Sequence, residues 1–310
     1  MSGVNKQKII VVVGPTASGK TSLGIKIANK VNGEIVSADS MQIYKNMPIA
    51  SAAPTVEEMC GVKHHLIGFA EPSHRFSVAE YVSLATKTID DIIKRGKTPI
   101  IVGGTGLYID SLVFGISFSD EDNIEIRKAL EEEFDRIGAE AMLEQLRLID
   151  PDTAQKYHIN DRKRIIRAFE IYRIHGKTKT EVDRDSKLNG DRYDAIFIGL
   201  GFCDREVLYS RINRRVEVMC EAGLVEEAKM AFSENAGATS IQAIGHKEIF
   251  PYFKGEATLQ DVLEKLKLET RHYAKRQMTW FRKNDKINWI YVDKSTDILG
   301  EALKIINERK

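Results

Sequence analysis

Short apolar runs alternate with longer segments of helical periodicity along most of the chain. Five runs have the length and the β-branched content of buried strands, at residues 9–13, 34–37, 98–102, 195–200 and 289–292. After the first run, Leu23, Ile27 and Val31 recur every four positions, and a second helix is predicted over 78–94, ahead of Gly96. Strands that alternate with helices predict an α/β fold with a parallel sheet and helices on both faces.

The pattern changes between about residues 117 and 187, where charged sequence of helical type replaces the strand-like runs. The polar stretch after Gly176 leads back into the run at 195–200. We therefore interpret 117–189 as a helical insertion domain within a core built from 1–116 and 190–310. The last part of the core is again mostly helical, with a break at Gly223 and a helix around 263–283.

The composition is that of a globular protein that does not enter a membrane. The 310 residues are 43% hydrophobic and 29% charged, and the first apolar run is too short to cross a bilayer or to act as a signal peptide. The three cysteines are scattered and form no C-x-x-C pair, which argues against a disulfide framework or a zinc site. We expect a cytoplasmic, monomeric enzyme.

The net charge of +1 conceals three strongly biased segments. Residues 120–135 carry about −6, whereas 162–179 carry about +6 and 271–286 about +5. Charge that attracts a phosphate backbone acts locally, so the two basic segments are candidates for nucleic-acid contacts. Solvated helix faces are the alternative explanation of either segment.

The clearest chemical motif is GPTASGKT, at 14–21, which fits G-x-x-x-x-G-K-[ST] with a strand before it and a helix after it. Glycines let backbone N–H groups close around phosphate oxygens, and the helix N-terminus adds partial positive charge. Lys20 supplies a full charge, and the Thr21 hydroxyl is a candidate ligand for Mg²⁺. The residues predicted to bind a diphosphate are Gly14, Thr16, Ala17, Ser18, Gly19, Lys20 and Thr21.

A nucleotide hydrolase normally holds its Mg²⁺ partly through an aspartate at the end of a buried strand. The corresponding strand here ends in Gly103-Gly104-Thr105, without a carboxylate. A carboxylate does follow the second predicted strand, at Asp39. Because ligands bind at the carboxyl ends of parallel strands, Asp39 is a candidate metal ligand or general base. A turn or helix-capping role is the alternative for Asp39.

Several segments together resemble the tRNA dimethylallyltransferase family, which prenylates the adenosine just 3′ of the anticodon. GPTASGKT is followed in the family's order by SADSMQIY, HHLI, FSVAEY and GGTGLY, and then by NDRKRIIRAFEIY, RINRRVEVM, QAIGHKE and TRHYAKRQMTWFR. The resemblance covers nearly the whole chain. It implies a P-loop NTPase-like parallel sheet core flanked by helices, with a helical insertion domain.

The resemblance implies that the loop binds the diphosphate of dimethylallyl diphosphate, which is the leaving group. Asp39 then matches the base that accepts the proton from adenine N6, and Thr105 matches a nearby substrate contact. Mg²⁺ on Thr21, together with Lys20, would neutralise the departing diphosphate. In RINRR, Arg211 and Arg215 have the i, i+4 spacing that places them on one helix face, and the resemblance favours Arg215 as the diphosphate contact. A solvated, salt-bridging helix face is the alternative for these arginines, more so for Arg211 and Arg214 than for Arg215.

The resemblance also implies contacts with the anticodon stem-loop of tRNA. The matching residues are Asp39, Ser40, Met41, Gln42 and Thr105 for the target nucleotide, Arg127, Lys163, Arg164, Ile165, Ile166 and Arg167 in the insertion, and Gln242, Ala243, Ile244, Gly245, His246 and Lys247 near the C-terminal helices. In the basic helix near the C-terminus we assign Lys275, Arg276 and Arg282 to RNA. Its aromatic residues, Tyr273, Trp280 and Phe281, are assigned mainly to the core.

The sequence departs from the family pattern in two places. The segment at 48–54 has Ala50 and Ala53 where the family usually has glycine and lysine, and His246 stands where tyrosine is commoner. Adjacent histidines at His64 and His65 are assigned a structural role or a role in shaping the donor channel, because no third metal ligand lies at suitable spacing. Two other activities remain open: prenyl transfer to free adenine nucleotides and an ATP-dependent small-molecule kinase.

Overall fold

The chain forms two compact units, Met1–Val113 with Tyr193–Lys310, and Phe114–Arg192. The computed structural model describes residues 6–115, 123–188, 190–233 and 243–309. The first unit contains the sheet, and the second unit is helical within its described residues.

The sheet of the first unit has six parallel strands in the order β3-β2-β4-β1-β5-β6. The strands are β1 Lys8–Val13, β2 Gly33–Ser37, β3 His64–His65, β4 Thr98–Gly103, β5 Asp194–Gly201 and β6 Ile287–Tyr291. Five of them correspond to the predicted apolar runs, whereas the two-residue β3 was not predicted because it is too short to show a period. The register pairs Val13 with Gly103 and Ser37 with Val102, so β2, β4 and β1 end side by side.

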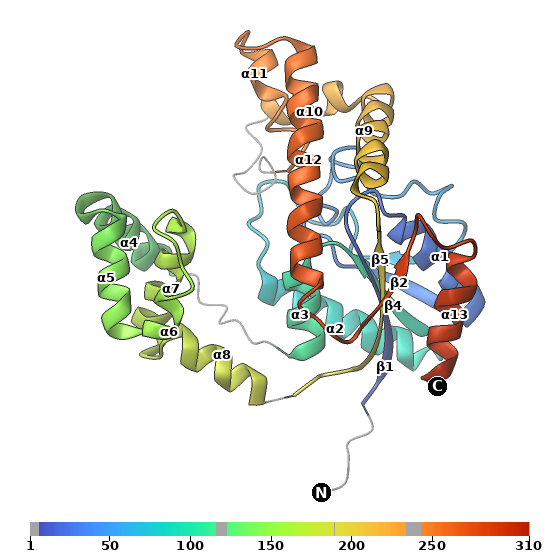
Figure 1. Ribbon diagram of the computed structural model, residues 1–310, viewed down its shortest axis with the longest axis horizontal. Helices are drawn as coiled ribbons and strands as arrows, with labels where there is room; N and C mark the ends of the chain where they lie inside the picture. The colour runs from blue at the N-terminus through green and yellow to red at the C-terminus, as the bar shows by residue number, and fades with distance from the viewer. Residues whose placement is uncertain (1–5, 116–122, 189, 234–242, 310) are drawn as a thin grey trace, which may run out of the picture. The chain divides into compact units, whose positions relative to one another are not determined.

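Helices cover both faces of the sheet (Figure 1). The helices α1 Lys20–Val31 and α13 Ile298–Glu308 bury their apolar side chains against one face, in a cluster that includes Ile10, Val12 and Ile306. The helix α2 Val78–Lys94 lies on the other face and has the predicted bounds. The helix α3 Gly106–Phe114 packs on α2 through the stacked rings of Tyr81 and Tyr108, whose centroids are 4.2 Å apart.

A second group of helices follows β5 and extends beyond the ends of the strands (Figure 1). These helices are α9 Arg205–Glu221, α10 Leu224–Ser233, α11 Phe250–Phe253 and α12 Leu259–Phe281. Gly223, with a φ of +100°, separates α9 from α10, as the sequence pattern predicted. A cluster of Ala17, Phe202, Ile212 and Ala274 packs α9 and α12 directly against the phosphate loop.

The second unit consists of α4 Ile124–Ile137, α5 Ala139–Ile149, α6 Pro151–Ala154, α7 Arg162–His175 and α8 Lys179–Leu188. Its own core is formed by residues such as Leu130, Phe134, Leu146 and Phe169. Over the described ranges, none of the protein's helices combines the length and hydropathy that a membrane crossing requires.

Candidate active site

The phosphate loop joins β1 to α1 and follows a backbone path that its glycines allow. Gly14 and Gly19 have φ angles of +150° and +94°. A side chain at Gly14 would approach the carbonyl oxygen of Leu200 to 2.6 Å, so the loop lies against the end of β5. Gly19 precedes α1 without a side chain to cap it, which leaves N–H groups of the first turn for an anionic ligand.

Lys20 lies in the first turn of α1, and its Nζ donates to the carbonyl oxygen of Pro15 at 2.8 Å. The pKa of Lys20 is lowered to about 8, chiefly by burial and also by the charge of the nearby Arg215, while Asp39 acts in the opposite direction. Thr21 is half-buried in the same turn. The loop therefore holds a desolvated cation beside the helix N-terminus, which is an arrangement suited to a diphosphate.

Two arginines one turn apart on α9 lie near the loop. Arg211 donates from Nε to the carbonyl oxygen of Ala17 at 2.8 Å, and its guanidinium lies 5.8 Å from the ring centroid of Phe202. Burial lowers the pKa of Arg215, and the charge of Asp39 opposes this shift. Arg211 is thus an exposed residue whose Nε contacts the loop, and it lies one turn before Arg215 on α9, as their i, i+4 spacing indicates.

Asp39 and Thr105 follow the neighbouring strands β2 and β4. The backbone N–H of Thr105 donates to the carbonyl oxygen of Ala38 at 3.1 Å, and the Thr105 hydroxyl accepts from the N–H of Ser40 at 3.0 Å. Asp39 Oδ1 accepts from the N–H groups of Met41 and Gln42, at 2.9 and 3.4 Å. Asp39 therefore does form a turn, while no described donor reaches its Oδ2, which leaves that oxygen for a ligand.

Gln42, which was assigned to the target nucleotide, has its side chain engaged within the protein. Its Oε1 accepts from the Ser37 hydroxyl at 2.9 Å, and its Nε2 donates to the carbonyl oxygens of Ser51 and Ala52 at 3.4 and 3.2 Å. The Gln42 side chain thus ties the Asp39 turn to the segment that departs from the family pattern.

In the helical unit the proposed RNA residues separate into three kinds. The side chains of Ile165 and Ile166 are 0% and 3% exposed and belong to the core of the unit, so they are not available to RNA. Arg127 and Arg167 approach the buried carboxylate of Glu170, at 4.0 and 2.8 Å. Lys163 and Arg164 are exposed, although Arg164 lies 3.5 Å from Asp161.

The described residues from Ala243 to Glu248 are mostly buried. Ala243 and His246 are 1% and 0% exposed, whereas Lys247 is exposed. The Nε2 atom of His246 lies 2.8 Å from Oε1 of Glu227. The same oxygen accepts from the backbone N–H of Ala50 at 2.9 Å, and Oε2 of Glu227 accepts from that of Ile49 at 2.8 Å. His246 therefore has an internal role here, and two departures from the family pattern, Ala50 and His246, meet on one carboxylate.

Gly245 and Ile244 complete the same segment. Gly245 has a φ of +120° and would meet Ala50 if it carried a side chain, and Ile244 packs in the cluster of α9 to α12. Gln242 lies outside the described residues. Of the proposed RNA residues in this segment, Lys247 alone among the described ones presents an exposed charge.

The adjacent histidines have structural partners. The Nδ1 atom of His64 lies 2.8 Å from the carbonyl oxygen of Val62, and Nε2 of His65 lies 2.7 Å from Glu34. Glu34 also binds Arg95 and Lys97, which lowers the pKa of the glutamate. Within the described ranges, no group of three or more His, Cys, Asp or Glu residues is arranged to hold a metal ion.

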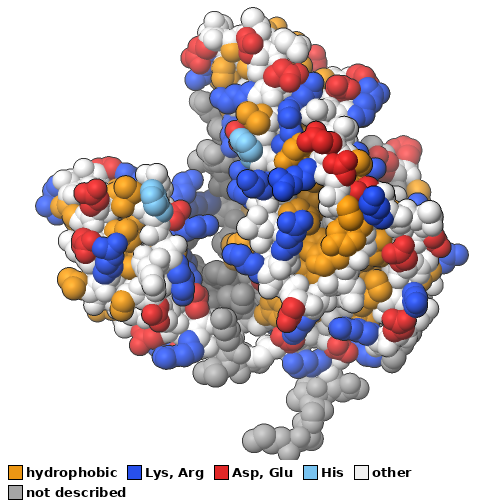
Figure 2. Space-filling model, in the orientation of Figure 1, with side chains coloured by type: hydrophobic (Ala, Val, Ile, Leu, Met, Phe, Trp, Pro, Cys, Tyr) orange, Lys and Arg blue, Asp and Glu red, His pale blue; other side chains and the backbone are white. Residues whose placement is uncertain are grey.

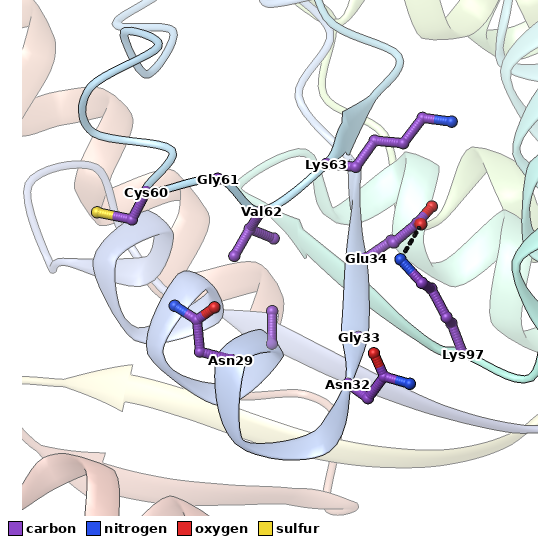
Figure 3. A pocket seen from close by; sticks show the side chains of 10 residues that line it. Asn29, Asn32, Gly33, Glu34, Cys60, Gly61, Val62, Lys63 and Lys97 are labelled. Carbon is purple, nitrogen blue, oxygen red and sulfur yellow. Dashed lines mark hydrogen bonds and ion pairs between the residues drawn. The ribbon is translucent and has the colours of Figure 1, made fainter.

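Glu34 and Lys97 line a cavity of about 310 Å³ that is separate from the phosphate loop (Figure 3). Its other lining residues come from the end of α1 and from the segment around Cys60 and Lys63. Gly33, Lys97 and Lys63 mark the amino ends of β2, β4 and β3, so this cavity lies at the edge of the sheet opposite to Asp39 and Thr105. Glu34 and Lys97 at this cavity belong to an internal ion-pair cluster with Arg95 and His65.

Basic side chains gather on the surface over α12, where Lys275, Arg276 and Arg282 are exposed (Figure 2). Phe281 is 2% exposed and belongs to the core, as was predicted for most of the aromatic residues of this helix, whereas Trp280 is 40% exposed. Trp280 donates from Nε1 to Asp110 at 2.7 Å. Burial raises the pKa of Asp110 to about 6, and the bond from Trp280 opposes this shift.

One further residue of α12, which the sequence analysis did not single out, lies in the site. Gln277 is 5% exposed and contacts both the phosphate loop and the segment before Thr105. A polar residue on the apolar face of an amphipathic helix is the signal that identifies it.

Comparison with known proteins places this arrangement in a family. The family model described as IPP transferase matches residues 42–284. A tRNA dimethylallyltransferase of Thermoanaerobacter sp. (strain X514) is 48% identical over 291 residues, covering 92% of each chain. The tRNA dimethylallyltransferase of Bacillus subtilis (strain 168) is 44% identical over 295 residues, covering 94% of this chain and 93% of the relative.

Solved structures are similar along the whole chain. The crystal structure of a tRNA delta(2)-isopentenylpyrophosphate transferase from Staphylococcus epidermidis is 41% identical, with a TM-score of 0.73, and the match covers 98% of this chain and 100% of that one. A eukaryotic dimethylallyltransferase acting on tRNA has a TM-score of 0.84 at 30% identity, covering 98% of this chain and 79% of that one. The P-loop-like fold expected from the resemblance is thereby confirmed, and the chain belongs to the IPP transferase family.

Proposed function

We propose that this protein transfers a dimethylallyl group from dimethylallyl diphosphate to N6 of the adenosine that is 3′-adjacent to the anticodon of tRNA, and releases pyrophosphate. The relatives at 43–48% identity carry the name tRNA dimethylallyltransferase. The observation that carries the proposal is the position of the Asp39 carboxylate, which follows β2 at the carboxyl ends of neighbouring strands, where its charge acts on two half-buried cations, Lys20 and Arg215.

The reaction forms a bond between N6 and the allylic carbon and breaks the bond between that carbon and the diphosphate oxygen. Asp39 accepts the N6 proton through Oδ2, while Oδ1 stays in the turn with Met41. The electron pair of the broken bond leaves with the diphosphate, whose growing charge is stabilised by Lys20, Arg215 and the N–H groups of the loop. The Thr105 hydroxyl helps to hold the adenine beside Asp39.

A divalent cation fits this donor set. Thr21 offers a hard hydroxyl oxygen in the first turn of α1, and Mg²⁺ is commonly bound by one or two protein ligands together with substrate phosphates. When bound, Mg²⁺ would supply additional neutralisation of the diphosphate. Thr21 and the diphosphate oxygens would hold it.

The exposed cations are the best candidates for contacts with the tRNA backbone. In the helical unit these are Lys163 and Arg164, and in the core unit they are Lys247, Lys275 and Arg276. We assign the cytoplasm as the place of action because unmodified tRNA is the substrate.

A paired assay tests the function. The purified protein is incubated with Mg²⁺ and labelled dimethylallyl diphosphate, with unmodified bulk tRNA in one tube and AMP, ADP and ATP in another. Label at N6 of an adenosine in tRNA supports the proposal. Label in the free nucleotides alone would instead identify a nucleotide prenyltransferase, and transfer of phosphate from ATP to a small molecule would identify a kinase.

Asp39→Asn tests the role of this residue as a base while keeping its hydrogen bond in the turn with Met41. The amide keeps an oxygen that accepts from Met41, but it cannot accept the N6 proton, so we expect the rate of prenyl transfer to fall by about 10²–10⁴-fold. Binding of tRNA, measured by filter retention, should change less than a few-fold. If the variant kept the wild-type rate, Asp39 would not be the general base.

A further inference from the structure

The amide of Gln277 joins two loops that are far apart in the sequence. Its Oε1 accepts from the backbone N–H of Thr16, in the phosphate loop, at 2.8 Å. Its Nε2 donates to the carbonyl oxygen of Gly104, after β4, at 3.0 Å. Both ends of one buried amide are therefore used, one on each loop.

The contact between Gln277 and the segment after β4 is very close. A Cβ atom at Gly104 would lie 2.1 Å from Nε2 of Gln277 and 3.8 Å from Nζ of Lys20. A Cβ atom at the preceding Gly103 would lie 2.1 Å from the carbonyl oxygen of Ala38. Glycine at 103 lets the end of β4 lie against Ala38, and glycine at 104 lets α12 approach the same segment without a side chain between them.

The contacts of α12 extend to the acceptor side of the site. Tyr273, one turn before Gln277, lies beside the side chains of Thr105 and Gln277. Burial raises the pKa of its hydroxyl, and these two side chains oppose that rise with a smaller effect. Thr105 in turn accepts from the N–H of Ser40, next to Asp39. Gln277 is thus linked to the phosphate loop through Thr16, and to the Asp39 turn through Gly104, the adjoining Thr105 and Ser40.

We propose that Gln277 is a positioning residue that fixes the phosphate loop relative to Thr105 and the Asp39 turn, and so sets the distance between the allylic carbon and adenine N6. The inference rests on the proposed function. Two reactants must be brought to about 3–3.5 Å in the correct orientation, and a misplacement of about 1 Å can reduce the rate by about 10²-fold. A single amide that bonds to both loops limits such misplacement.

Gln277→Met tests the inference because methionine has a similar shape and makes neither hydrogen bond. With saturating dimethylallyl diphosphate and tRNA, we expect the single-turnover rate of label transfer to fall by about 10- to 100-fold. The dissociation constant for tRNA should change less than about twofold, because Gln277 is buried and does not face RNA. A merely structural role would lower the melting temperature and the active fraction, but not the rate per folded molecule.

Gly104→Ala disrupts the contact between Gln277 and Gly104 without replacing Gln277. The added methyl group would displace the glutamine amide, so this variant should show a similar loss of rate, and the double variant should lose little more than either single one. Thr279→Ala is the matched control on α12, since its exposed hydroxyl bonds to the carbonyl oxygen of Lys275 in the same helix. The control should keep the wild-type rate.

The outcomes separate the two proposals. If wild-type protein transfers label to tRNA while Gln277→Met and Gly104→Ala both keep its single-turnover rate, the positioning role is overturned and the proposed function stands. If wild-type protein transfers no label to tRNA, the proposed function itself fails. Should Gln277→Met not fold, Gly104→Ala and Gln277→Glu, which keeps an acceptor for Thr16 and loses the donor to Gly104, decide the question.

Discussion

Several arginines of the helical unit and the two cations near the phosphate loop of the core unit have opposite surroundings. In the helical unit, arginines lie on carboxylates of the same unit, as in the pairs Arg167–Glu170 at 2.8 Å and Arg173–Glu133 at 2.6 Å, and the pair Arg162–Asp135. At the strand ends of the core unit, the described residues place no carboxylate within 4.0 Å of the charged nitrogens of Lys20 or Arg215. Burial lowers the pKa values of both groups.

The difference indicates which cations serve structure and which await a ligand. A cation that is paired within the protein gains little from a further anion, because its charge is already offset. A cation that is desolvated without a paired carboxylate destabilises the folded state, and a bound diphosphate would offset that cost. Basic sequence in the two units therefore has different consequences, although the residue types are the same.

The largest effect is expected from removing the charge of Lys20. Lys20→Met should reduce prenyl transfer by on the order of 10²–10³-fold, because a donor that stabilises the departing diphosphate is lost. The same change should raise the melting temperature at pH 7 by a few degrees, since a buried cation is removed. The label assay measures the expected loss of transfer, and calorimetry measures the expected rise in melting temperature. A variant that melts at a lower temperature would contradict our account of Lys20.

The protonation of Lys20 predicts how stability and diphosphate affinity depend on pH. Its pKa is about 8 in the folded protein, against an ordinary value of 10.5 for a solvated lysine, so between these values the unfolded chain binds a proton that the folded one does not. The contribution of Lys20 to stability therefore rises with pH over this window, and the stability advantage of Lys20→Met should shrink there. Affinity for dimethylallyl diphosphate should fall above about pH 8, and Lys20→Arg, which stays charged, should not show that fall.

Arg215 and Arg214 give a matched pair on α9 with a smaller expected effect. Arg215→Gln should raise the KM for dimethylallyl diphosphate by about 10- to 100-fold, because a charge-assisted hydrogen bond to phosphate is typically worth about 1.5–3 kcal/mol. Arg214 is 65% exposed and lies 3.2 Å from Glu217, so Arg214→Gln should change the KM less than about twofold. Equal effects of the two changes would refute the distinction between them.

The smallest effects are expected in the helical unit, and they differ in kind. Arg167→Met removes a partner of the buried Glu170 and should lower the stability of this unit by about 1–3 kcal/mol, visible as faster amide exchange in α7. Lys163→Gln with Arg164→Gln should leave exchange unchanged, weaken tRNA binding a few-fold, and reduce the slope of log affinity against log salt by about 1–2. An unchanged slope would indicate that Lys163 and Arg164 lie on a solvated helix face and do not contact the tRNA.

Elements with a strong local period were predictable from the sequence. The five longer strands were found because each is a short apolar run, and α2 was found because its sequence has helical periodicity. The two-residue β3 is too short to show either pattern. The phosphate loop was found because its glycines are required by its own backbone. The assignment of Ile165 and Ile166 to RNA failed because a motif match reports position along the chain and not which face of α7 is buried.

By itself, the sequence determined the alternation of strands and helices, the phosphate loop and the position of Asp39 after a buried strand, since each depends on residues close together in the chain. The tertiary structure alone decided that Gln277 meets Thr16, 261 positions away, that Arg211 meets Ala17, and that His246 and Ala50 share Glu227. Such contacts depend on how α9 and α12 pack against the strand ends. Packing is a property of the whole fold, and no local pattern of residues encodes it.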